Sequence, residues 1–123
     1  MINYEVSDRI ATITWDMDRP QNVINAESCL AFSQAINRAL QDQSVTGVII
    51  TSGKWDFHAG ADLDALMRLS DAQQVIDFSA QWHKINRKIE TGGKPFVAAI
   101  NGSALGGGYE LCLSCHYRIA SNY

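Results

Sequence analysis

Two loops of small residues contain the positions in this chain that are best suited to chemistry. The first runs from Phe57 to Leu63 and the second from Asn101 to Glu110. Small residues allow a backbone N–H group to approach a ligand without a side chain in the way. Each loop is expected to lead into a helix, whose start adds unpaired N–H groups and a dipole that favours negative charge. Two such helix starts directed at one point would form an oxyanion hole.

The glycines of the second loop have to be compared with other glycine motifs. The spacing of Gly102 and of Gly106-Gly107-Gly108 does not match G-x-G-x-x-G, and no lysine stands where a P-loop requires one. Close packing of a helix against a strand is the alternative explanation for these glycines. Glu110 favours a functional explanation, because it falls near the first turn of a mostly apolar helix. A carboxylate in such a setting is costly unless it is paired or catalytic.

Histidine and cysteine side chains are further candidates for chemistry. His58 in the first loop is suited to acid–base work, but we favour its interpretation as a loop side chain near the ligand. Cys112, Cys115 and His116 fit the haem-attachment pattern C-x-x-C-H. Attachment requires an exported chain, and the sequence shows no signal peptide. We expect the cysteines to pack as small hydrophobic residues in a helix, and we expect no metal site.

Hydrophobic periodicity predicts the elements that position the two loops. Alternation over residues 2–15 indicates a β-hairpin with a turn at Ser7-Asp8-Arg9. Asn25 is a candidate cap for a helix whose apolar stripe extends to Leu40. The run from Val45 to Thr51 is nearly all apolar. It predicts a strand that is buried on both faces, in a sheet covered by helices.

The second half of the chain continues this order. A short helix is expected near Asp62, with Leu63, Leu66 and Met67 facing inward. Ser70 and Gln73 form a capping-box pattern before a longer helix that Gly92-Gly93 ends. The apolar stripe of that helix consists of Val75, Phe78, Trp82, Ile85 and Ile89. A strand over 96–100, a helix from Gly106 to about Ser114 and a strand over 117–120 follow. A hairpin followed by strand–helix units predicts the α/β class.

Composition limits the classes of function. The 123 residues suit one domain, and 46% of them are apolar, so a disordered chain is excluded. The net charge of −3 argues against a nucleic-acid partner. The basic cluster of Lys84, Arg87 and Lys88 is interpreted as a solvated helix face. No apolar run is long enough to span a membrane, and we expect a cytoplasmic protein.

Both loops together resemble the signature of the crotonase (enoyl-CoA hydratase/isomerase) superfamily. The matching residues are Ala59-Gly60-Ala61-Asp62-Leu63 and Asn101-Gly102-x-Ala104-x-Gly106-Gly107-Gly108-x-Glu110-Leu111, with support from Pro20, Asn25, Lys94-Pro95 and Arg118-Ile119-Ala120. The stretch 108–120 is closest to the hydratase part of bifunctional fatty-acid-oxidation proteins, which also carry a 3-hydroxyacyl-CoA dehydrogenase. The resemblance implies a crotonase-like (ββα) spiral. Residues 1–123 would then be the amino-terminal portion of the domain, with the remainder absent.

The resemblance also implies roles for single residues. The N–H groups of Ala61 and Gly107 would form the oxyanion hole, and Glu110 would be the first of two catalytic glutamates that act on water. The second glutamate would lie beyond Tyr123. The segments that match the coenzyme A pocket supply Val23, Ile24, Ala59, Gly60 and Asp62, although core packing explains Val23 and Ile24 almost equally well. Arg19 and Lys54 are candidates for contacts with phosphate, but their pattern is that of ordinary surface charges.

The function implied is that of an enoyl-CoA hydratase of fatty acid β-oxidation. The alternatives are an enoyl-CoA isomerase or other crotonase-fold enzyme, and a binding module without catalysis. Hydration requires no cofactor, because the substrate itself carries coenzyme A. NAD would be needed only if a dehydrogenase domain follows. We expect a homo-oligomer or a part of a fatty acid oxidation complex, and we expect the 123 residues alone to be inactive.

Overall fold

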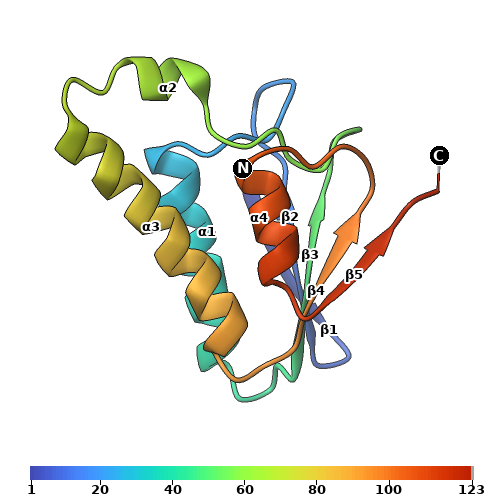
Figure 1. Cartoon of the computed structure of the whole chain (residues 1–123). Coiled ribbons are helices and arrows are strands. Elements are labelled where there is room, and N and C mark those ends of the chain that lie inside the picture. The colour runs from blue at the N-terminus through green and yellow to red at the C-terminus, as the bar shows by residue number, and fades with distance from the viewer. Residues whose placement is uncertain (123) are drawn as a thin grey trace.

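A five-stranded sheet in the order β1-β2-β3-β4-β5 organises the computed structural model, which describes residues 1–122 (Figure 1). The strands are β1 (Ile2–Ser7), β2 (Ile10–Trp15), β3 (Gly47–Ser52), β4 (Phe96–Ile100) and β5 (Tyr117–Ala120). The helices are α1 (Ala26–Gln41), α2 (Leu63–Met67), α3 (Ala72–Thr91) and α4 (Gly107–Ser114). Strands β1 and β2 are antiparallel, and every later pair is parallel. The predicted α/β class is confirmed.

Local sequence explains how the first three elements form. Asp8 and Arg9 have positive φ angles of 51° and 69°, so a tight two-residue turn joins β1 to β2 as predicted. Asn25 caps α1: its side chain accepts a hydrogen bond from the Ser28 N–H at 2.8 Å, and the Ser28 hydroxyl accepts one from the Asn25 N–H at 2.9 Å. This reciprocal pair fixes the first residue of the helix. The predicted cap is therefore confirmed.

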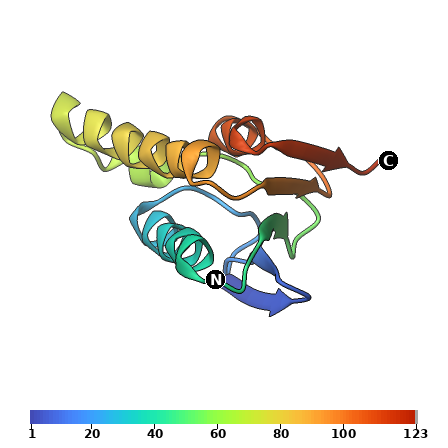
Figure 2. The ribbon, with the colours of Figure 1, turned by 90° about the horizontal axis from the view of Figure 1, so that it is seen from below.

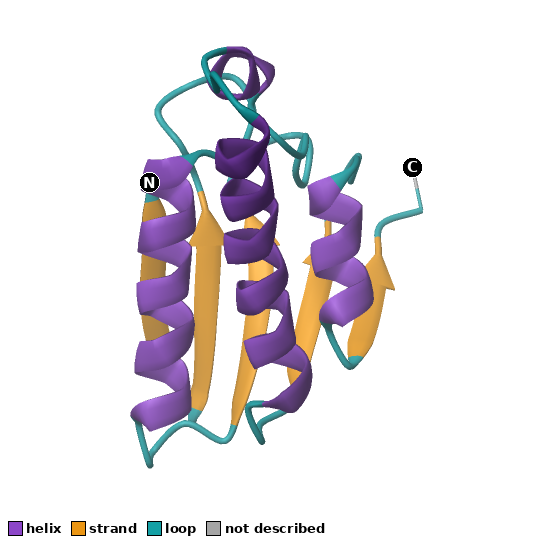
Figure 3. Ribbon diagram, turned by 60° about the vertical axis from the view of Figure 1, so that its left-hand side comes forward, coloured by secondary structure: helices purple, strands orange, loops and turns teal. Residues whose placement is uncertain are grey.

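Helices α1, α3 and α4 pack on one face of the sheet (Figures 2 and 3). On that face Ile13, Ile50 and Ala98 are fully buried. On the opposite face Ile49 and Val97 are only partly buried, and within residues 1–122 no helix lies over them. The prediction that β3 is buried on both faces is therefore wrong for the described residues. Its apolar run is continuous because Ile49 adds an apolar side chain to the uncovered face.

Two predictions about α2 and α3 need correction. Of the three residues expected to face inward from α2, Leu63 and Met67 are 72% and 83% exposed, whereas Leu66 is partly buried. The cap of α3 is Asp71, one residue later than predicted, and its carboxylate accepts a hydrogen bond from the Gln74 N–H at 2.8 Å. An acidic side chain at this position displaces Ser70, whose N–H is bonded by the Gln74 side chain at 2.6 Å instead.

Only part of the predicted apolar stripe of α3 lies in the core. Trp82, Ile85 and Ile89 are buried, whereas Val75 is 45% exposed. The first half of α3 extends beyond the sheet, so its apolar residues have no strand beneath them (Figure 1). The second half of the helix is therefore the part that supports the loops.

The last elements follow the prediction closely. Strands β4 and β5 occupy the predicted residues, and α4 starts one residue later than predicted, because Gly106, with a positive φ of 50°, is its cap. Cys112 and Cys115 are free and buried, as predicted, although Cys115 follows the end of α4 in an extended conformation; burial raises the pKa of their thiols to about 11 and about 12. Thiols that stay protonated at neutral pH are poor nucleophiles. In the part of the chain that the structure describes, no helix is long and apolar enough to cross a membrane.

Candidate active site

The two small-residue loops lie side by side along their backbones. The Leu105 N–H donates to the His58 carbonyl at 2.9 Å, and the His58 N–H donates to the Ser103 carbonyl at 3.0 Å. Gly60, with a φ of +88°, allows a close approach: a Cβ at this position would lie 2.8 Å from the Leu105 carbonyl oxygen and 3.2 Å from the Gly107 nitrogen. Any larger residue would force the loops apart. The contact places the start of α4 directly against the first loop.

Ile24 holds the first loop from its other side. Its N–H donates to the Gly60 carbonyl at 2.8 Å, and its carbonyl accepts from the Asp62 N–H at 2.9 Å. Ile24 and Ala61 thus form a parallel bridge in which Gly60 and Asp62 supply the bonded groups. In a parallel ladder the residue between two bonded neighbours directs its own N–H elsewhere. The Ala61 N–H is therefore left unused by this bridge.

The N–H groups of Ala61 and Gly107 both lack a hydrogen-bond acceptor within the described residues. Among residues 1–122, neither donates a hydrogen bond to another residue. Gly107 is the first residue of α4, so its N–H also lies at the positive end of the helix dipole. Ala61, Gly107 and Glu110 line one cavity of about 250 Å³. The remaining lining residues are Ile24, Leu66, Val75, Phe78, Ser79, Trp82 and His83. Two residues with unused main-chain donors, one from each loop, therefore line the same cavity.

Trp82 fixes the Gly107 turn from the side of α3. Its indole Nε1–H donates to the Gly107 carbonyl at 3.2 Å, and the side chain is only 3% exposed. From the sequence Trp82 was placed in the apolar stripe of its helix, and its role at the site was missed. A buried tryptophan needs a partner for its N–H group, which is the signal that points beyond core packing.

Glu110 lies at the edge of the cavity instead of inside the core. Its side chain is 51% exposed, whereas its neighbours Leu111 and Cys112 are buried. The expectation of a carboxylate in an apolar setting is therefore not met in the described residues. The reason is helical geometry: α4 turns Leu111 and Cys112 toward the sheet and leaves Glu110 facing α3. The nearest basic group is on His83, whose Nε2 is 3.9 Å from Glu110 Oε2.

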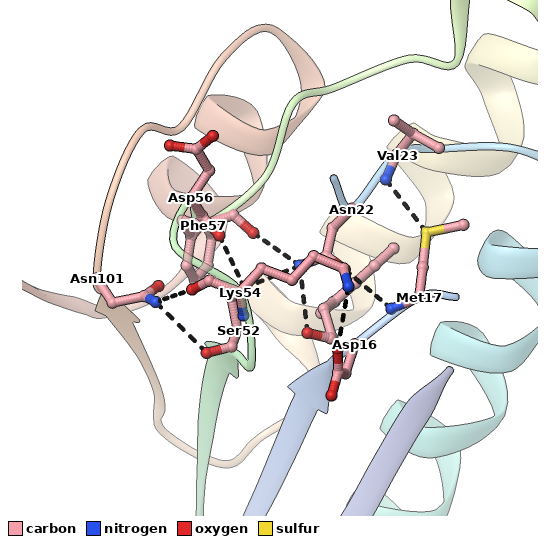
Figure 4. Close-up of polar contacts among 10 residues, drawn as sticks. Asp16, Met17, Asn22, Val23, Ser52, Lys54, Asp56, Phe57 and Asn101 are labelled. Carbon is pink, nitrogen blue, oxygen red and sulfur yellow. Dashed lines mark hydrogen bonds and ion pairs between the residues drawn. The ribbon is translucent and has the colours of Figure 1, made fainter. Parts of the chain in front are cut away.

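Asn22 joins the first loop to the ends of two strands (Figure 4). Its side chain is buried, and its amide nitrogen donates to the Trp15 carbonyl, the Ser52 hydroxyl and the Phe57 carbonyl at 3.2, 2.9 and 3.1 Å. Its amide oxygen accepts from the Met17 N–H at 3.2 Å. This residue was missed from the sequence, where it stands in a polar loop. The only signal is an asparagine directly before two apolar residues.

The residues expected near coenzyme A are divided between several environments. Val23 and Gly60 are buried, Ala59 is partly buried, and Ile24 alone of the predicted set lines the cavity. Asp62 caps α2 and pairs with Arg19 at 2.9 Å. Burial is the largest single influence on Asp62 and opposes its ionised form, but the hydrogen bond and charge of Arg19 together with the Ala65 N–H outweigh it and lower the pKa of the carboxyl group.

The candidate phosphate contacts and the candidate ligand histidine have other partners. Arg19 is engaged with Asp62, and Lys54 pairs with Asp16 at 3.1 Å. His58 is 1% exposed, and its Nδ1 accepts a hydrogen bond from the Gly60 N–H at 3.0 Å. Burial lowers the pKa of the His58 ring to about 4, so the ring is neutral near pH 7. His58 supports the first loop from beneath and does not line the cavity.

Fold and site together define a class of protein: an α/β scaffold in which two loops and a helix start bring unused main-chain donors beside a carboxylate. No group of three or more potential metal ligands occurs within residues 1–122. Residues 5–123 match the family described as Enoyl-CoA hydratase/isomerase, and the chain therefore belongs to this family.

Relatives of known sequence agree with the family. The chain is 37% identical over 119 residues to a crotonyl-CoA hydratase of Syntrophomonas wolfei, which covers 96% of this chain and 45% of that protein. It is 38% identical over 117 residues to a fatty acid oxidation complex subunit alpha of Shewanella oneidensis, which covers 94% of this chain and 17% of that protein. The chain thus spans less than half the length of these relatives.

Solved structures show the same fold. An enoyl-CoA hydratase from Bacillus anthracis superposes with a TM-score of 0.90 at 28% identity, covering 97% of this chain and 46% of that one. An enoyl-CoA hydratase/isomerase from Xanthobacter autotrophicus gives a TM-score of 0.91 at 28% identity, covering 97% and 45%. The fold is therefore of the crotonase type, as predicted.

Proposed function

We propose that the protein is an enoyl-CoA hydratase that adds water across the 2,3 double bond of an enoyl-CoA thioester. The observation that carries the proposal is the pair of unused N–H groups of Ala61 and Gly107 at a cavity that also holds Glu110. Family membership and the relative named as a crotonyl-CoA hydratase support it. As a hydratase of fatty acid β-oxidation, the protein would act either alone or in the hydratase part of a bifunctional subunit.

The reaction requires negative charge to be stabilised on the thioester oxygen. When the oxygen of water bonds to the β-carbon, an enolate forms, and the Ala61 and Gly107 N–H groups would bind its oxygen. Such a donor pair is worth most in the transition state, where each donor typically contributes about 3 kcal/mol. Glu110 would orient the water and accept its proton. Protonation of the α-carbon then completes the addition, with no cofactor required.

The remaining assignments extend this proposal. We infer that the segments with Val23-Ile24 and Ala59-Gly60-Ala61-Asp62 border the coenzyme A pocket, because Ile24 and Ala61 are joined by a bridge at the cavity. NAD would be used only by a dehydrogenase domain. The relatives named as fatty acid oxidation complex subunits support a part in such a complex. We also propose a homo-oligomer, from the family resemblance, and a cytoplasmic location.

The test is hydration of crotonyl-CoA by the full-length protein, followed as loss of the conjugated absorbance. Glu110→Gln should lower kcat at least about 100-fold, because a positioned acid–base group contributes that much or more. Glu90→Gln is the matched control, since Glu90 is a similarly exposed carboxylate outside the cavity (48% against 51%). Equal activity of the two variants would contradict the proposal.

Two other outcomes separate the alternatives. A shifted double bond, with no 3-hydroxyacyl product, would identify an isomerase. Binding of crotonyl-CoA in calorimetry without turnover by the unaltered protein would identify a binding module. Mass and chromatography of the reaction mixture distinguish the double-bond isomer from the 3-hydroxyacyl product.

A further inference from the structure

We propose that His83 is a positioning residue for Glu110, holding one carboxylate oxygen so that the other faces the reacting water. The inference rests on the proposed function, because it assigns a second residue to the same site. His83 and Glu110 come from different helices, α3 and α4, and both line the cavity that contains the Ala61 and Gly107 N–H groups.

The two oxygens of Glu110 have different surroundings. Oε2 is 3.9 Å from His83 Nε2. Oε1 lies on the side of Gly107, 3.6 Å from the position that a Cβ on Gly107 would occupy. One oxygen is therefore directed to the imidazole and the other toward the turn where the thioester oxygen would bind. A base that must act on a water beside that oxygen needs this orientation.

The backbone around His83 is fixed relative to Glu110. The adjacent Trp82 is bonded through its indole N–H to the Gly107 carbonyl at 3.2 Å, which ties this turn of α3 to the first residue of α4. Glu110 follows Gly107 by three residues, within one helical turn. His83 is thus carried by a rigid connection to the start of the helix that presents Glu110.

The pair is suited to orientation and adds little to folding stability. Both side chains are more than half solvent-exposed, at 67% and 51%, and exposed pairs at such distances contribute little to stability. Within residues 1–122, His83 is the only basic side chain within 4.0 Å of the Glu110 carboxylate. A substrate that fills the cavity removes water from the pair, which strengthens and shortens the contact.

The experiment compares variants of the full-length protein in crotonyl-CoA hydration. His83→Leu should lower kcat by about 10- to 100-fold, the usual effect of a misplaced catalytic group, with KM changed less than about threefold. His83→Gln should restore much of kcat, because its amide is also a donor on a side chain of moderate length. Arg87→Leu is the matched control: it removes an equally long, exposed pair, Arg87–Glu90 at 3.9 Å, one turn along the same helix and outside the cavity.

The outcomes separate this inference from the proposed function. If the unaltered protein does not hydrate crotonyl-CoA, the proposed function is wrong. If it does, and His83→Leu and Arg87→Leu have the same kcat, the inference alone is overturned. A raised KM at unchanged kcat also overturns it, because His83 would then contact substrate directly. His83→Ala, with circular dichroism of each variant, ensures that a folding defect is not read as a loss of positioning.

Discussion

Single buried polar side chains hold the first loop in place, and they are satisfied to different degrees. Asn22 uses both ends of its amide in hydrogen bonds. His58 uses only Nδ1, which accepts from the Gly60 N–H, while its buried Nε2 has no partner among the described residues. The ring instead packs edge-on against Trp15, with centroids 4.4 Å apart. This arrangement requires a neutral ring, since a charge at Nδ1 would abolish the bond to Gly60.

Burial of neutral His58 predicts a loss of stability in acid. The pKa of the His58 ring is about 4 in the folded protein, against the ordinary value of 6.5 that applies in the unfolded chain. Between about pH 4 and pH 6.5 the unfolded state therefore binds more protons than the folded state. The contribution of neutral His58 to the free energy of unfolding should be fully present above about pH 6.5. It should be lost as the pH decreases toward about 4, which lowers the free energy of unfolding by at most about 3 kcal/mol. Urea unfolding of the full-length protein at several pH values measures this difference.

Two variants separate the effect of His58 from that of carboxylates that titrate over a similar range of pH. His58→Gln should remove this part of the pH dependence, whereas His83→Gln, at an exposed position, should leave it unchanged. Identical slopes for the two variants would show that His58 does not control the acid response.

At the scale of elements, the hydrophobic pattern predicts the ranges of strands and helices well, but it predicts their caps and their long-range contacts poorly. The ranges of β4, α4 and β5 follow directly from apolar runs between Gly, Pro and Asn residues. The cap of α3 was placed one residue early because Ser70 and Asp71 are both good caps, and only the hydrogen bonds decide between them. Periodicity also cannot show that Trp82 bonds to Gly107 or that His83 faces Glu110, since these contacts join residues more than 20 positions apart.

The connection of β2 and β3 to the first loop depends on Asn22, and its removal should be unusually costly. Asn22→Ala would leave the Phe57 carbonyl and the Met17 N–H without their partner inside the protein, whereas the Trp15 carbonyl keeps its hydrogen bond from the Gly53 N–H at 2.9 Å. Each unsatisfied buried group costs about 1–3 kcal/mol, so we expect a loss of about 2 kcal/mol or more.

Asn25→Ala is the matched control for this prediction. It removes a helix cap of the same residue type three positions away, for a typical cost of about 1 kcal/mol. Free energies of unfolding from urea titration give the comparison. A cost of Asn22→Ala no larger than that of Asn25→Ala would contradict the role assigned to Asn22.

At the scale of the whole molecule, the sheet has one covered and one uncovered face. Alternation in a strand indicates which side chains share a face, but not what lies above them. By register, Val97 is beside Ile49 and Tyr117, and Ala99 is beside Ile119. These residues form an apolar surface across β3, β4 and β5 that no element of residues 1–122 covers (Figure 3).

This surface predicts self-association when residues 1–123 are produced as a separate polypeptide. Tyr117 and Ile119 are each 67% exposed and lie on β5, which within residues 1–122 pairs with β4 alone and leaves one edge of backbone donors and acceptors open. Exposed apolar patches beside an open strand edge favour association. Light scattering coupled to size exclusion should show a mass that rises with concentration. Ile119→Lys should shift it toward the monomer, because a charge on an edge strand opposes pairing, whereas Leu30→Lys, at a similarly exposed position on α1, should not. A monomeric mass at every concentration would contradict the prediction that the uncovered face drives self-association.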